Sequence, residues 1–131
     1  MEQEVQAAFA EMLDISTDID KAVLFGPEGV LASNMAAEAQ TIAVTQAGEI
    51  ISLGEARASE MGSQPFTQLV VETPGGYVFF ARELRPDAMN ILATGKKGSR
   101  VGLVLYDLRT CMRDAREAIG AAGQGQESGE A

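Results

Sequence analysis

The chain has 131 residues, of which 46% are hydrophobic, and its 19 acidic and 10 basic side chains give a formal net charge of −9. This acidity argues against nucleic acid and anionic membranes as partners, because both are bound by clustered Lys and Arg. A single Cys excludes an internal disulfide, no segment is apolar enough to span a membrane, and the first residues lack the basic start of a signal peptide, so we expect one cytoplasmic domain.

The predicted elements begin with an amphipathic helix over residues 2–15, in which apolar side chains recur at helical spacing. Two short strands follow at residues 22–25 and 30–32, separated by a turn that contains Gly and Pro. A long helix then begins at Asn34, a favourable N-cap residue, and ends just before Gly62.

Three more strands are predicted over residues 66–73, 77–84 and 88–94, and a last amphipathic helix over residues 101–119. Residues 120–131 are Gly-rich, polar and without periodicity. We therefore expect a single domain of residues 1–119 and a disordered tail of residues 120–131.

The hairpin predicted over residues 66–84 carries large apolar side chains on both of its faces. Leu69, Val70 and Val71 are consecutive in its first strand, and Phe79 and Phe80 are adjacent in its second. Neighbouring side chains of a strand point to opposite faces, so both faces of this sheet must be covered. The predicted fold is a three-layer α+β sandwich with the element order α-β-β-α-β-β-β-α, in which the long helix covers one face of a five-stranded, mostly antiparallel sheet and the first and last helices cover the other.

The long helix has a wider apolar arc than a single chain requires. Its apolar residues span roughly 200° of the helix, against the ~100° that packing on one sheet uses. Many of them are small, as at Ala43, Ala47 and Gly54, which allows a close approach of another backbone. A self-association surface explains this better than the alternative, an Ala-rich helix with a generous core face.

The sequence offers few groups for catalysis or metal binding. It contains no His, and Cys111 falls on the apolar stripe of the last helix, as a core residue would. The segment GKKGS at residues 95–99 lacks the spacing of a phosphate-binding loop. We therefore predict no enzymatic activity, no catalytic residue, no cofactor and no metal.

Arg109, Arg113 and Arg116 form a basic stripe along one side of the last helix. A solvated helix face is the favoured interpretation and a partner contact is the alternative. Arg113 and Glu117 have the spacing of an ordinary ion pair within a helix.

The order and lengths of these elements resemble the Roadblock/LC7 domain family, which includes dynein light chains, LAMTOR-type (Ragulator) scaffolds and the MglB-like regulators of small GTPases. The likeness covers about residues 5–119. It is carried by KAVLFGPEGVLASN, by the Ala-rich helix ending near SLGEARASEMG, and by QLVVETPGGYVFFAREL, NILAT and VGLVLYDLRTCMRDAREAI. The plain, single-domain arrangement is most similar to prokaryotic members.

This resemblance implies a homodimer in which the third strands of two subunits pair, so that one sheet continues across the interface, and the long helices pack against each other. It also implies a non-enzymatic regulator or scaffold of a Ras-like small GTPase. The expected dimer interface consists of Ala43, Ala47, Ile50, Ile51, Gly54, Leu69 and Val71. The expected partner-binding residues, on the polar side of the long helix, are Glu38, Gln46, Glu49 and Ser52.

Two other functions are compatible with the same pattern of elements. One is a small-molecule sensor of the PAS, GAF or profilin-like type, which would need a cavity with converging polar groups. The other is an adaptor for a histidine kinase or a motor complex, without any effect on nucleotide turnover.

Overall fold

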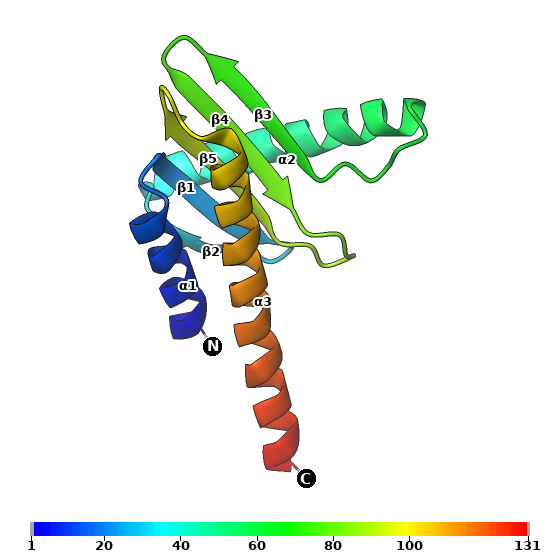
Figure 1. The fold of residues 1–131 in the computed structure, drawn as a ribbon. Helices are drawn as coiled ribbons and strands as arrows, with labels where there is room; N and C mark the ends of the chain where they lie inside the picture. The colour runs from blue at the N-terminus through cyan, green and yellow to red at the C-terminus, as the bar shows by residue number, and fades with distance from the viewer. Residues whose placement is uncertain (1, 131) are drawn as a thin grey trace.

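The computed structural model describes residues 2–130, with side chains described as far as residue 120. Its elements are α1 (Glu2–Ile15), β1 (Ile19–Gly26), β2 (Gly29–Ser33), α2 (Ala37–Glu60), β3 (Gln68–Thr73), β4 (Gly76–Arg82), β5 (Asn90–Lys96) and α3 (Val101–Glu130). α2 crosses one face of the sheet, and α1 and α3 lie side by side on the other (Figure 1). The predicted α+β fold and its element order are confirmed.

All five strands form one antiparallel sheet in the order β2-β1-β5-β4-β3. β5 lies at the centre, although it is the last strand in the sequence. It pairs with β1 through contacts such as Val23 with Leu92, and with β4 through contacts such as Phe79 with Ala93. β2 and β3 are consequently the two edges of the sheet within one chain.

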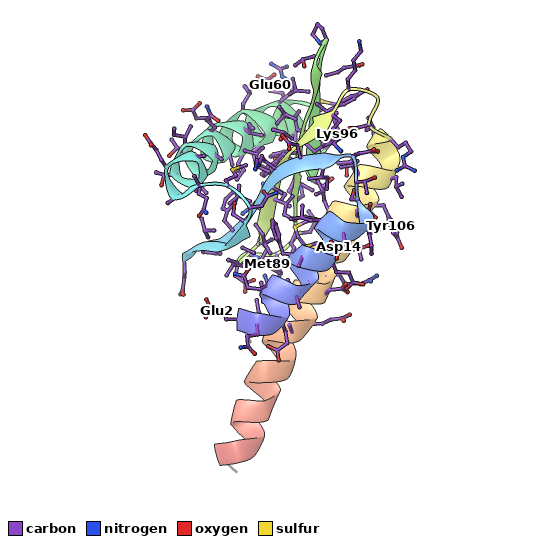
Figure 2. The ribbon with its side chains drawn as sticks, turned by 90° about the vertical axis from the view of Figure 1, so that its left-hand side faces the viewer. Glu2, Asp14, Glu60, Met89, Lys96 and Tyr106 are labelled. Atoms are coloured by element: carbon purple, nitrogen blue, oxygen red, sulfur yellow. The ribbon has the colours of Figure 1, made fainter. Side chains whose placement is uncertain are left out.

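The core consists of two layers, one on each face of the sheet, and side chains fill the space between sheet and helices (Figure 2). Phe79 belongs to the layer under α1 and α3, and Phe80 to the layer under α2; both are fully buried. This is the alternation expected of a strand that is covered on both faces. The prediction is therefore confirmed for β4.

The edge strand β3 is covered much less than the sequence predicts. Leu69 and Val71 point to the same face and keep 38% and 44% of their surface exposed. β3 lies outside the central strands, where α2 does not cover it fully (Figure 1). Within one chain, the apolar face of this strand therefore lacks a complete cover.

The start of α2 differs from the prediction, whereas its end agrees. The helix begins at Ala37, and the side chain of Asn34 does not cap it. Instead, the Asn34 amide accepts a hydrogen bond from the Ala22 backbone N–H at 2.8 Å and donates one to the Asp20 carbonyl at 3.0 Å, which ties this segment to β1. At the other end, Gly62 adopts a φ of 69°, the left-handed conformation that commonly follows a helix.

α3 continues as a helix through Glu130, beyond the predicted helix end at residue 119 (Figure 1). The segment contains no Pro, so its sequence permits a helical backbone even though its glycines favour one only weakly. The side chains of residues 121–131 lie outside the described residues, and the predicted disorder of residues 120–131 stays a prediction. Within residues 2–130, no helix has the length and apolar character required to cross a bilayer.

Candidate protein-interaction site

Two small residues on α2, Ala43 and Ala47, face the sheet of their own chain. Ala43 is 7% exposed and Ala47 is 0% exposed. Both pack in the core layer that contains Phe80 and Leu92. Ile51 is half-buried against the same layer. The assignment of Ala43 and Ala47 to a dimer interface is corrected here, because their small side chains let α2 lie close to its own sheet.

The C-terminal half of α2 lines a groove beside the edge strand β3. This α2–β3 groove has a volume of about 610 Å³. Ile50, Gly54 and Leu69, three of the predicted interface residues, line it. Leu53 and Met61 also line it and are 74% and 69% exposed. Exposed large apolar side chains in one concave patch are typical of a protein-interaction surface.

A cluster of side chains holds the α2–β3 connection in place and shapes the groove. The Glu55 carboxylate accepts hydrogen bonds from the Phe66 backbone N–H at 3.2 Å and from Arg82 Nη1 at 2.8 Å. The Phe66 ring stacks on Phe80 with a centroid separation of 5.8 Å, and the Arg82 guanidinium lies 5.4 Å from the Phe66 centroid. The groove wall is thereby linked to α2, to the connection and to β4.

The Phe66 ring packs directly against α2 at Gly54. A Cβ atom at Gly54 would lie 2.7 Å from two ring carbons, whereas one at Gly48 in the same helix would meet nothing within 4 Å. We expect Gly48→Ala to raise the free energy of unfolding by up to about 1 kcal/mol, because Ala is the better helix former. We expect Gly54→Ala to lower it by about 1 kcal/mol, because overpacking against Phe66 outweighs that gain.

Urea unfolding of the two glycine variants beside the original protein measures both effects. Equal stabilisation by the two substitutions would contradict the close packing of Gly54 on Phe66.

The predicted partner-binding residues all lie on the exposed side of α2. Glu38, Gln46, Glu49 and Ser52 are each exposed. Ile42, which is 53% exposed, lies on the same side of the helix. The surface is therefore a mixed one, with carboxylates and amides around isolated apolar side chains. Its role in partner binding stays a prediction.

The arginine stripe of α3 divides into two kinds of residue. Arg109 and Arg113 are exposed, whereas Arg116 is partly buried and pairs with Glu83 at 2.6 Å and with Asp87 at 3.2 Å. The hydrogen bond with Glu83 is the largest cause that raises the pKa of Arg116 above its ordinary value, and the charges of Glu83 and Asp87 add to it. Arg116 thus joins α3 to the segment between β4 and β5, rather than lying in a solvated face. Arg113 pairs with Asp114 and not with Glu117.

Cys111 and the segment of residues 95–99, which were considered for catalysis or phosphate binding, are both held by contacts within the fold. Cys111 is 2% exposed, and burial raises the pKa of its thiol to about 12, so it stays protonated at neutral pH. In the segment before α3, Gly98 has a φ of 83°, and the Ser99 hydroxyl donates to the Lys96 carbonyl. Across the residues whose side chains are described, no group of three or more Cys, Asp or Glu is arranged to hold a metal ion.

Comparison with protein-family models and with curated proteins finds no match. Solved structures do match. MglB of Myxococcus xanthus has a TM-score of 0.72 at 10% identity, over 92% of this chain and 90% of that one. The gliding protein MglB of Thermus thermophilus has a TM-score of 0.69 at 17% identity, over 88% and 90% of the two chains. A Roadblock/LC7 domain from Streptomyces avermitilis has a TM-score of 0.75 at 14% identity, over 87% and 96%.

The chain has the Roadblock/LC7 fold. At identities of 10 to 17%, these likenesses establish the fold that the order of elements predicts. The likeness extends over most of each chain, so the Roadblock/LC7 fold accounts for both layers of helices and the whole sheet.

The main features that sequence reasoning missed in this Roadblock/LC7 fold are the exposed walls of the α2–β3 groove. Leu53 is an apolar residue on the side of α2 that also carries Gln46 and Glu49, and that contrast is a signal of an uncovered surface. The predicted helix carries Met61 on its apolar side, whereas Phe66 lies in the connection after the helix, where periodicity carries no information. Their convergence depends on how the connection to β3 folds back along α2.

Proposed function

We propose that this protein is a homodimeric regulator or scaffold of a Ras-like small GTPase, which acts by binding and not by catalysis of its own. The observation that carries the proposal is the exposed, apolar α2–β3 groove beside the uncovered edge strand β3. An open strand edge next to exposed Leu and Met side chains is a surface that folded proteins normally cover.

A second copy of the chain is the occupant that the geometry favours for this groove. Pairing of two β3 edges would satisfy the free backbone groups of both strands and bring the two grooves together around a two-fold axis. A solved MglB structure of the same fold, with a TM-score of 0.69 and 18% identity, has a tetrameric arrangement. Self-association on this fold therefore supports a dimer here.

A binding role agrees with the chemistry that the chain offers. The sequence contains no His, and its one thiol is buried and protonated at neutral pH. The resemblance to MglB-like regulators supports a Ras-like GTPase as the partner. In such a role the GTPase supplies its own catalytic groups, and its regulator orders them.

The exposed side of α2 is our candidate for the GTPase-binding surface, with Glu38 and Glu49 as its carboxylates. Charges at the rim of an interface mainly set the association rate. We expect Glu38→Lys with Glu49→Lys to slow association with a Ras-like GTPase purified from the native host by about tenfold at low salt, while the dimer stays intact. Stopped-flow binding measures this rate, and single-turnover GTP hydrolysis in the same mixtures distinguishes a regulator from an adaptor.

A matched control reverses two exposed carboxylates elsewhere, Glu11 on α1 and Glu28 in the β1–β2 turn. It changes the net charge equally and is expected to leave the rate within about twofold of the original. Equal slowing by both double variants would contradict the assignment of this surface. GTP hydrolysis by the isolated protein would contradict the non-enzymatic role.

A further inference from the structure

Figure 1 shows α3 on the opposite side of the sheet from α2. A second groove lies between α3 and the segment that joins β4 to β5. It has a volume of about 470 Å³. Its lining includes Leu84, Arg85, Arg109, Met112, Arg113 and Arg116, and it is called the arginine groove below.

The arginine groove gathers several of the basic side chains of an acidic protein. Its four arginines are a large share of the ten Lys and Arg residues of a chain whose net charge is −9. Arg82 also borders the groove, but its guanidinium pairs with Glu55 of α2, so it is not counted with the four. Glu83 and Glu117 also line the groove, so the arginines that the nearby carboxylates leave unpaired are the ones that can attract an acidic partner.

Two of these arginines form ion pairs with carboxylates of the β4–β5 segment, and the other two keep donors free for a partner. Arg116 pairs with Glu83 and Asp87, and Arg85 pairs with Asp87. Arg109 has no carboxylate partner among the described residues; its Nη1 donates to the Gln68 amide oxygen at 2.8 Å. Arg113 is 62% exposed, and its only ion pair among the described residues is with its neighbour Asp114, through long contacts of 3.3 and 3.4 Å. Arg109 and Arg113 thus retain donors for an incoming carboxylate.

The groove also contains apolar surface next to these donors. Leu84 is 65% exposed in a turn beside the groove, and the buried Met112 lies on its α3 side. A partner must therefore offer an apolar side chain together with negative charge.

From this arrangement we infer that the arginine groove binds a short acidic segment of another protein, one in which carboxylates flank an apolar side chain. The carboxylates pair with Arg109 and Arg113, and the apolar side chain packs on the exposed Leu84. Arg favours this role because its planar guanidinium matches a carboxylate with two parallel hydrogen bonds.

A nucleic acid fits the same surface poorly. Polyanion binding depends on many cations that neutralise successive phosphates, and here two open arginines lie among Glu83, Asp87, Asp114 and Glu117. The arginine groove and the α2–β3 groove have no lining residue in common, so this inference does not rest on the proposed dimer or GTPase surface.

The test uses a fluorescein-labelled peptide of about a dozen residues that repeats Glu-Glu-Leu, with fluorescence anisotropy as the readout. We expect binding at low ionic strength that weakens as salt is added, and no binding of the same peptide with Gln in place of Glu. Arg109→Glu with Arg113→Glu should weaken peptide binding by at least about tenfold. The matched control is Lys96→Glu with Lys97→Glu, which makes the same charge change at two exposed residues outside the groove.

Equal loss in the lysine variant would overturn the proposal, because net charge and not the groove would then control binding. Absence of binding by the original protein at low salt would overturn it as well. Preferential binding of single-stranded DNA or of phosphatidylserine vesicles through Arg109 and Arg113 would also overturn the proposal, because the partner would then be a different kind of anion. Circular dichroism and light scattering of the arginine variant should match those of the original protein, because both side chains are exposed.

Discussion

Replacing Ala47 with Glu is expected to unfold the protein, or to lower its free energy of unfolding by at least about 3 kcal/mol. Ala47 is 0% exposed and packs between α2 and the sheet beside Phe80 and Leu92. A Glu side chain there has no room and no partner for its charge. Thermal unfolding followed by circular dichroism measures the loss.

The pH dependence of this variant separates the cost of the charge from the cost of the added volume. Burial raises the pKa of a carboxyl in the folded state above its value in the unfolded state. At a pH between these two pKa values, the carboxyl is protonated in the folded state and ionised in the unfolded state. The destabilisation by charge is therefore complete above the folded pKa, and falls as the pH is lowered towards about 5. The cost of the volume remains at every pH.

Gly48→Glu is the matched control, since it adds the same side chain at the next residue of the same helix. Gly48 is exposed, and a Cβ atom there meets nothing within 4 Å. We expect the control to fold with unchanged or slightly greater stability. A well-folded Ala47→Glu protein that only failed to self-associate would contradict the inward orientation of this residue.

The original protein is expected to be a dimer of about twice the 13.8 kDa chain mass at micromolar concentration. Leu53→Glu with Leu69→Glu should convert it to a monomer, with a dissociation constant raised on the order of a hundredfold or more. Both residues line the α2–β3 groove and are exposed in one chain, so the substitutions leave the core of each subunit intact. In a two-fold interface each substitution is present twice, which makes the effect large.

Light scattering and analytical ultracentrifugation measure this change. Leu84→Glu provides the control, because Leu84 is 65% exposed and lies outside the α2–β3 groove. It should remain a dimer. If the groove variant and the control were both dimers, the interface would lie elsewhere, and a monomeric original protein would remove the basis for a homodimer altogether.

The sequence by itself determined the elements, their order and the layers in which they pack. Helical and strand periodicity are local properties of the chain, and Gly62 ends α2 as its position predicts. The apolar pair Phe79 and Phe80 was enough to infer that β4 is covered on both faces, because adjacent strand residues always point in opposite directions.

Only the tertiary structure decided which backbone the small residues of α2 approach. Ala43 and Ala47 are compatible with close contact to the sheet of the same chain or to a second helix, and periodicity does not distinguish these contacts. The pairing of Arg116 with Glu83 and the packing of Phe66 on Gly54 likewise join residues far apart in the chain. Such contacts depend on the placement of whole elements, so the two grooves became visible only when α2, β3, β4 and α3 were in position.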